Sequence, residues 1–165
     1  MNAVPVLETV VIKLATRDDA ETVAGLLLKA FLPFRAEYTD GAFEYTTASA
    51  DVIRERFDEG PIWLAERDGV AIGTVSGLPE GERFYIRSMA IDPLAQRSGV
   101  GQLLLKTLET HARDAGFMRL YLYTTFVLPG AKRLYEKNDF YVLRETLPEE
   151  WFDMGGIEME KKLEK

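Results

Sequence analysis

The sequence contains no cysteine and a single histidine, His111, among its 165 residues. Without cysteine, the chain can form no disulfide, no thiolate metal site and no cysteine nucleophile. No cluster of histidine and carboxylate residues has the spacing of metal ligands, so a metal site has no support. We therefore expect a function that uses neither a metal nor a thiol of the protein.

Long apolar runs and an excess of positive charge are also missing. The chain carries 20 basic and 27 acidic residues, a net charge of −7. Binding to nucleic acids depends on many Lys and Arg contacts to phosphates, so this balance argues against such a partner. No segment reaches the roughly 20 apolar residues that cross a membrane, and no signal-peptide pattern is evident. We expect a cytoplasmic protein with no nucleic-acid or membrane partner.

The pattern of apolar residues predicts one domain, residues 1–165, with a mixed α/β sheet and helices on both faces. The predicted order is β-α-α-β-β-β-α-β-α-β-β. Residues 35–49 are expected to form a loop, and the acidic and basic C-terminus a solvated edge strand and tail. Strands are predicted at 9–15, 61–69, 70–78, 83–91, 118–125, 140–147 and 155–163, and helices at 16–31, 49–57, 99–115 and 129–138.

A basic, glycine-containing turn, Gln96-Arg97-Ser98-Gly99-Val100-Gly101, lies between a predicted strand and a long predicted helix. The first amides of a helix have no intrahelical partner and lie at the positive end of the helix dipole. Gly99 and Gly101 would let a ligand approach the backbone, and Arg97 adds a positive charge. These features predict an anion site, most simply for phosphate. The turn is not a P-loop, because the G-x-x-x-x-G-K-[ST] pattern is absent. It is not a good dinucleotide fingerprint either, because G-x-G-x-x-G would need glycine at position 104, which is leucine.

Two segments resemble the Gcn5-related N-acetyltransferase (GNAT) superfamily. The turn at 96–101 matches that family's [QR]-x-x-G-x-[GA] motif and follows "MAIDP", while "LYEKNDF" at 134–140 resembles its "LYEKxGF", with Asp139 in place of glycine. The predicted element order is similar to the family's over nearly the whole chain. The resemblance implies an acyl-CoA N-acyltransferase fold and transfer of an acetyl group from acetyl-CoA to a primary amine of a small molecule or protein, by direct attack in a ternary complex. A non-catalytic acyl-CoA-binding sensor of the same fold remains the alternative.

The resemblance also implies roles for individual residues. The amides from Arg97 to Gln102 would hold the pyrophosphate of coenzyme A, the Met89 amide would polarise the thioester carbonyl, and Tyr135 would be the general acid. The implied cofactor-binding residues are Met89, Ala90, Ile91, Gln96, Arg97, Ser98, Gly99, Val100, Gly101, Gln102, Ala131, Leu134 and Tyr135.

The sequence departs from the family's pattern at two places. Many members carry a glutamate two to four residues before the position of Met89, but this chain has Tyr85, Ile86 and Arg87 there. Glu82 and Tyr123 are left as candidates for the base. Leu128 stands where the family often has asparagine, which removes one polar contact to the cofactor.

The acceptor side is expected to include Tyr38, Glu44 and Tyr45, because aromatic and acidic side chains suit a cationic amine on a small molecule or peptide. His111 falls on the apolar face of its helix and is expected to be packed in the core. Trp63 and Trp151 are expected to be packing residues. A homodimer is left open, since dimers are common in the family.

Overall fold

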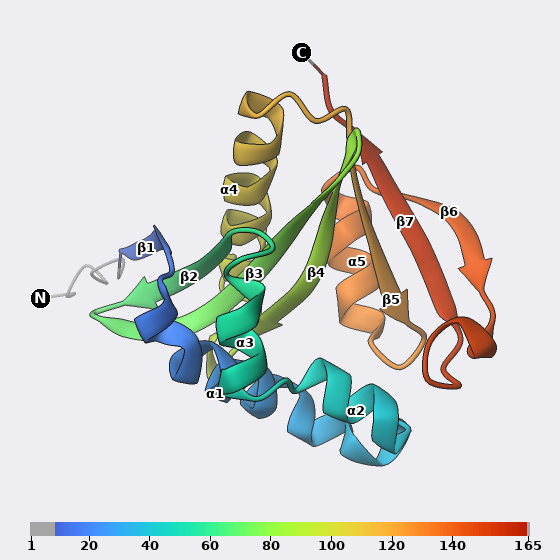
Figure 1. The fold of residues 1–165 in the computed structure, drawn as a ribbon, viewed down its shortest axis with the longest axis horizontal. Coiled ribbons are helices and arrows are strands. Elements are labelled where there is room, and N and C mark those ends of the chain that lie inside the picture. Colours follow the sequence, from blue (N-terminus) through green and yellow to red (C-terminus); the bar gives the residue numbers. More distant parts are fainter. Residues whose placement is uncertain (1–8, 165) are drawn as a thin grey trace, which may run out of the picture.

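The computed structural model of the protein describes residues 9–164, which form a seven-stranded mixed sheet in the order β1-β2-β3-β4-β5-β7-β6 (Figure 1). Its strands are β1 (Val10–Leu14), β2 (Ile62–Arg67), β3 (Val70–Glu80), β4 (Arg83–Ile91), β5 (Arg119–Thr125), β6 (Tyr141–Thr146) and β7 (Gly156–Lys162). Its α-helices are α1 (Ala20–Phe31), α2 (Asp40–Thr46), α3 (Ala50–Arg56), α4 (Val100–Asp114) and α5 (Pro129–Lys137). The β4–β5 pair is parallel and the other strand pairs are antiparallel.

The predicted class and the order of the strands are confirmed, but the helix α2 was not predicted. The segment 35–49, expected as a loop, contains the end of a 3-10 helix at Leu32–Glu37 and then α2. Thr39 begins α2, because its hydroxyl accepts a hydrogen bond from the Ala42 amide at 3.2 Å. A serine or threonine cap of this kind satisfies an otherwise unpaired helix amide. The prediction failed because seven residues are too few to display a helical period.

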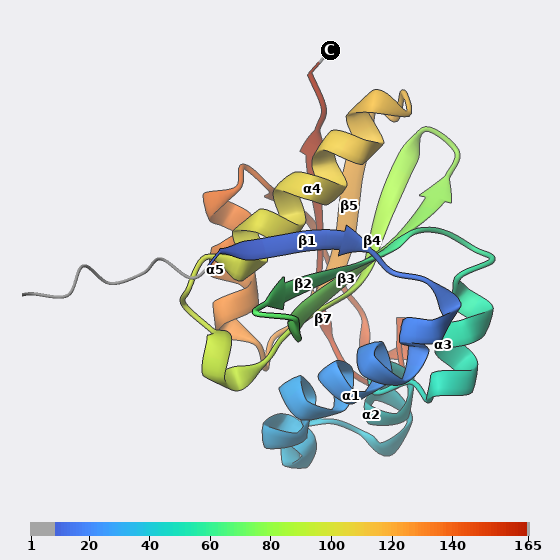
Figure 2. The ribbon, with the colours of Figure 1, turned by 90° about the vertical axis from the view of Figure 1, so that its left-hand side faces the viewer.

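Two layers of helices cover opposite faces of the sheet. Alternate residues of a strand point to opposite faces, so Ile62 and Leu64 join the apolar cluster of α1 and α3, while Trp63 and Ala65 join the cluster of α4. The helix α5 contributes Tyr135 to that second cluster. Figure 2 shows α4 and α5 on one side of the sheet and α1, α2 and α3 on the other.

The strand β7 corrects a second expectation. It pairs with both β5 and β6 and is therefore an interior strand, not a solvated edge. Ile157 and Met159 face the α4 cluster. Glu158 and Glu160 face the other way, yet their residues are only 4% and 3% exposed. These two glutamates are therefore buried charged groups that need partners.

His111 lies at the edge of the core rather than within it. Its ring contacts Trp63 and Phe84, with centroid distances of 5.2 and 5.6 Å, but the residue remains exposed. The predicted contact with the apolar face is present, whereas the predicted burial is wrong.

Candidate functional site

The central feature of the site is a gap in the sheet between β4 and β5. The two strands pair only at Arg83–Arg119, Phe84–Leu120 and Tyr85–Tyr121. Beyond Tyr85 they diverge toward their carboxyl ends (Figure 1). A β-bulge follows in β4, because Ile86 pairs with Gly77 and Ser88 with Ser76, which leaves Arg87 as the extra residue. Bulges bend a strand and often occur beside functional sites.

The divergence leaves backbone groups of β4 without a strand partner. The Asp92 amide donates to the Ile72 carbonyl of β3 at 2.8 Å. Because amides along a strand alternate in direction, the Ala90 amide also points to β3. The amides of Met89 and Ile91 point the other way, toward the gap. An extended ligand with its own amides can therefore add to β4 as a strand does.

The turn that follows β4 leads to the first residues of α4. Gly99 is the N-cap of that helix with φ of 85°, and Arg97 also has a left-handed φ of 66°. Glycine adopts such a φ without steric cost, and a glycine cap supplies no side chain for the first helix amides. Those amides therefore remain available to an anion. Asp92 fixes the start of the turn by accepting from the Leu94 amide at 2.9 Å.

The two glycines of the predicted motif have different roles. A Cβ on Gly99 would meet nothing within 4 Å, so its left-handed φ is the constraint. A Cβ on Gly101 would lie 3.0 Å from Leu134 Cδ2, so this buried glycine permits α4 to approach α5. Close packing is therefore one reason for glycine at position 101, and a contact of its backbone with a ligand stays a prediction. The other predicted cofactor-binding residues of this turn differ in exposure. Val100 is buried, while the exposed ones are Gln96, Arg97, Ser98 and Gln102.

Tyr135 is a buried residue of α5. Its ring packs edge-on against Phe140, with the centroids 5.6 Å apart, and it shares an apolar cluster with Met89. Burial raises the pKa of Tyr135 to about 12. The hydroxyl is therefore protonated at neutral pH and can donate. Ala131 and Leu134 pack against the same cluster.

A wall of packed side chains joins α2 to the segment between β6 and β7, and it consists of Thr39, Tyr45, Trp151 and Phe152. Thr39 Oγ1 donates to the carbonyl oxygen of Phe152 at 2.7 Å. The Tyr45 ring packs against Trp151 and Phe152, with centroid distances of 6.0 and 5.6 Å. Trp151 is therefore part of this wall as well as a packing residue.

The three residues expected at the acceptor side differ in environment. Tyr38 is buried between Phe31 and Phe43, and burial raises its pKa. Glu44 and Tyr45 are exposed on α2. Of the three, Tyr45 alone combines an exposed ring with contacts to Trp151 and Phe152.

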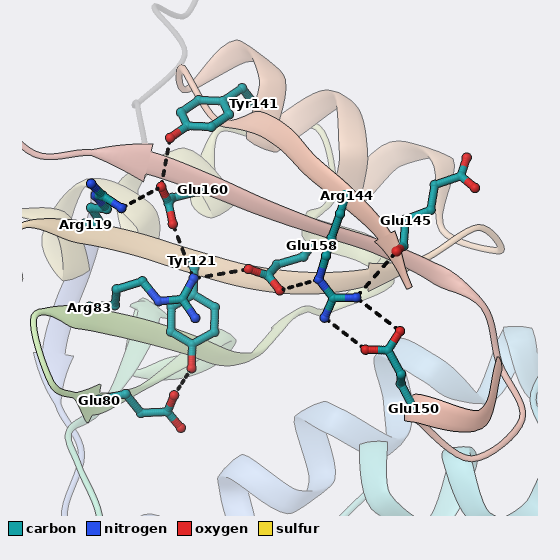
Figure 3. A network of polar contacts seen from close by, with 10 residues as sticks. All are labelled: Glu80, Arg83, Arg119, Tyr121, Tyr141, Arg144, Glu145, Glu150, Glu158 and Glu160. Atoms are coloured by element: carbon teal, nitrogen blue, oxygen red, sulfur yellow. Dashed lines mark hydrogen bonds and ion pairs between the residues drawn. The ribbon is translucent and has the colours of Figure 1, made fainter. Parts of the chain in front are cut away.

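A polar network covers the sheet face beside this wall (Figure 3). Arg83 lies 3.1 Å from Glu158 and 3.2 Å from Glu160, with its guanidinium carbon 3.7 Å from the centre of the Tyr121 ring. Further partners of the two glutamates are Arg119, Tyr141 and Arg144, and Tyr121 donates to Glu80. Sequence reasoning missed this network, although the alternation of Glu158 and Glu160 with Ile157 and Met159 was a signal that both faces of β7 have fixed neighbours.

Residues 26–140 match the acetyltransferase (GNAT) family. The chain belongs to this family. It is 38% identical over 104 residues to a mycothiol acetyltransferase of Thermomonospora curvata, covering 61% of this chain and 34% of the relative. It is 26% identical over 112 residues to N-acetyltransferase 8 of Homo sapiens, covering 63% and 48%. The chain therefore spans about a third to a half of the length of these curated relatives.

Solved structures of the family share the fold. The PaiA N-acetyltransferase of Thermoplasma acidophilum, solved in complex with coenzyme A, superposes with a TM-score of 0.80 at 18% identity, covering 93% of this chain and 99% of that one. Ard1 of Thermoplasma volcanium gives 0.78 at 18% identity, covering 94% and 99%. Within residues 9–164, no helix is long and apolar enough to span a membrane, and no group of three or more His, Asp or Glu residues is placed to hold a metal ion.

Proposed function

We propose that this chain transfers an acetyl group from acetyl-CoA to an amine. The observation that carries the proposal is the unpaired edge of β4, where the Met89 and Ile91 amides point into the gap beside β5. The residues present fit coenzyme A. A strand edge suits the amide-containing pantetheine arm, and the uncapped α4 amides with Arg97 suit the pyrophosphate. When bound, acetyl-CoA supplies an acyl group activated as a thioester.

Two residues act on the reacting atoms. The Met89 amide donates a hydrogen bond to the thioester carbonyl oxygen, where negative charge develops as the amine attacks. Donors fixed in advance at such a position are often the largest catalytic contribution. The Tyr135 hydroxyl gives its proton to the sulfur of the departing thiolate, and its raised pKa keeps that proton available at neutral pH.

Neither of the two candidates for the base, Glu82 and Tyr123, is suited to take the proton of the amine. Glu82 lies seven residues before Met89, in the turn before β4, and at about 3.3 Å per residue this is roughly 20 Å away. Tyr123 has a pKa raised by burial and by the charge of Glu158, so it is protonated and can only relay. We infer that the amine attacks in its neutral form and that water accepts the proton. The acceptor approaches past Glu44 and Tyr45, which are exposed on α2, while the buried Tyr38 supports α2 from behind.

The proposal is tested by following free thiol release from acetyl-CoA across a panel of amines, with calorimetric titration of coenzyme A in parallel. Amine-dependent thiol release supports the transferase. Tight binding of coenzyme A without turnover of any amine would instead indicate an acyl-CoA sensor. Failure to bind coenzyme A would overturn both.

A further inference from the structure

Two buried guanidinium groups lie on the face of the sheet opposite α4. Arg56, the last residue of α3, is 5% exposed. The side chain of Arg87, the bulge residue of β4, is 8% exposed. Neither residue belongs to the turn that would hold coenzyme A.

These two guanidinium groups share fewer anions than buried charges normally have. Arg87 Nη1 pairs with Glu59, but Nε and Nη2 of Arg87 are buried without a hydrogen-bond partner. Arg56 Nη1 lies 3.5 Å from Ser88 Oγ, and its guanidinium lies 5.4 Å from the centre of the Tyr45 ring. The cluster thus holds two cations and one carboxylate, and the pKa of Arg56 is lowered by burial and by the charge of Arg87. Buried charges are normally paired.

The orphaned atoms of Arg87 have a definite geometry. The Nε–H and one Nη2–H of a guanidinium point in the same direction and form the fork that binds two oxygens of a carboxylate or phosphate. The bulge places this fork two residues before Met89, about 7 Å along β4. Tyr45, which contacts Arg56, packs on Trp151 and is one of the residues expected at the acceptor side.

We infer that the acceptor amine also carries an oxyanion, a carboxylate or a phosphate, which Arg87 binds through Nε and Nη2 while Arg56 adds a second positive charge. This inference rests on the proposed transferase function and names its substrate class, that of amino acids and related aminophosphates. The inference adds an acid to the expected cationic amine, because two arginines repel an ammonium group that has no acid beside it.

Matched pairs of amines test the inference. Phenylalanine is compared with phenylalaninamide, and O-phosphoethanolamine with ethanolamine, by kcat/KM for thiol release. We expect the wild type to prefer the oxyanion member of one pair by about 100-fold, the size typical of a charged hydrogen-bonded contact. The preferred pair identifies the oxyanion. Equal use within both pairs, or preference for the neutral members, overturns the inference.

Variants separate recognition from folding. Arg87→Met should abolish the preference, mainly by raising KM for the oxyanion member far more than for the neutral member. Arg87→Lys keeps the positive charge but not the two-pronged fork, so it should retain part of the preference. Arg54→Met is the matched control, because this exposed arginine of α3 pairs with Asp51 and Glu21. It should leave the preference unchanged. An equal loss for both members of a pair in Arg87→Met would show that Arg87 only holds α3 against β4, and would overturn the inference.

A binding measurement keeps the inference testable if no amine is acetylated. With coenzyme A present, N-acetylphenylalanine and its amide are titrated calorimetrically into the wild type and Arg87→Met, and likewise N-acetylated O-phosphoethanolamine and ethanolamine. Tighter binding of an oxyanion member by the wild type alone supports the site even where the proposed transferase fails. Indifference in both pairs overturns the site even where transfer is observed.

Discussion

Lys29 of α1 donates a hydrogen bond to Asp92 at the end of β4, with 3.1 Å between Nζ and Oδ2. Asp92 also accepts from the Leu94 amide through its other oxygen. One carboxylate therefore connects the first helix to the turn that begins α4. The position of that turn depends on a charge that titrates in acid.

Replacing Asp92 by asparagine should lower stability in a pH-dependent manner. The Leu94 amide, followed by Lys29, lowers the pKa of Asp92 in the folded protein. A lowered pKa stabilises the fold at pH values above the unfolded value of about 3.9, and the effect is lost as the pH falls through the folded value. The difference in free energy of unfolding between wild type and Asp92→Asn, measured in urea, should be largest near pH 7 and vanish in strong acid.

The control for this experiment is Asp68→Asn in the exposed turn between β2 and β3. It should stay within about 0.5 kcal/mol of wild type at each pH. A difference for Asp92→Asn that does not change with pH would contradict the proposed role of its charge.

Replacing Gly99 by valine should weaken coenzyme A binding at least ten-fold. The φ of 85° at this position costs an L-residue about 1–2 kcal/mol, and the turn amides would shift to relieve that strain. Calorimetric titration with coenzyme A measures the affinity, and urea unfolding checks that the variant is folded. Gly25→Ala is the control, because apart from its own helix backbone no atom lies within 4 Å of the added Cβ. We expect a gain in stability of about 0.5–1 kcal/mol with unchanged affinity for coenzyme A. Wild-type affinity in folded Gly99→Val would remove the turn from the cofactor site.

Removing the hydroxyl of Tyr135 should reduce kcat with little change in KM for acetyl-CoA. Tyr135→Phe keeps the ring that packs on Phe140. We expect a loss of about 100-fold, the low end for general acids, because a thiolate leaves readily. Since burial raises the pKa of Tyr135 to about 12, the loss should be the same from pH 7 to pH 9. A variant with wild-type kcat would mean that water protonates the thiolate.

Neutralising Glu160 should lower the free energy of unfolding by more than the loss of an exposed charge does. Glu160→Gln leaves Arg83 and Arg119 facing a neutral group at a position that is 3% exposed. Breaking a fully buried pair costs about 3–5 kcal/mol, and because both arginines are partly exposed we expect about 2 kcal/mol in urea unfolding. Glu136→Gln removes an exposed pair with Lys132 and should cost under about 0.5 kcal/mol. Equal effects of the two variants would show that burial of Glu160 contributes nothing.

The parts of the fold that could be predicted depend on local signals. The strand before Asp92, the turn with Gly99 and the helix α4 follow one another within about 30 residues, so their periods and their glycine were visible in the sequence. The same holds for the motif that contains Tyr135. Whether these residues act in catalysis stays a prediction.

The parts that could not be predicted depend on partners far away in the sequence. Arg83 is 75 residues from Glu158, and no local pattern indicates that an alternating acidic strand will be placed between β5 and β6. The unpaired Nε and Nη2 of Arg87 result from a bulge in β4 and from the position of α3. From sequence alone, an arginine in a strand would be taken as an exposed residue.

The short ladder between β4 and β5 has a consequence for the exchange of amide hydrogens with solvent. A strand in the middle of a sheet is normally protected along its whole length, but β4 is paired on one side only after Tyr85. Deuterium should therefore enter at Met89 and Ile91 as it does at an edge strand, while Ala90 between them exchanges slowly. Adding coenzyme A should slow exchange at the two exposed amides and leave Ala90 unchanged, so one stretch of three residues reports whether the gap is filled.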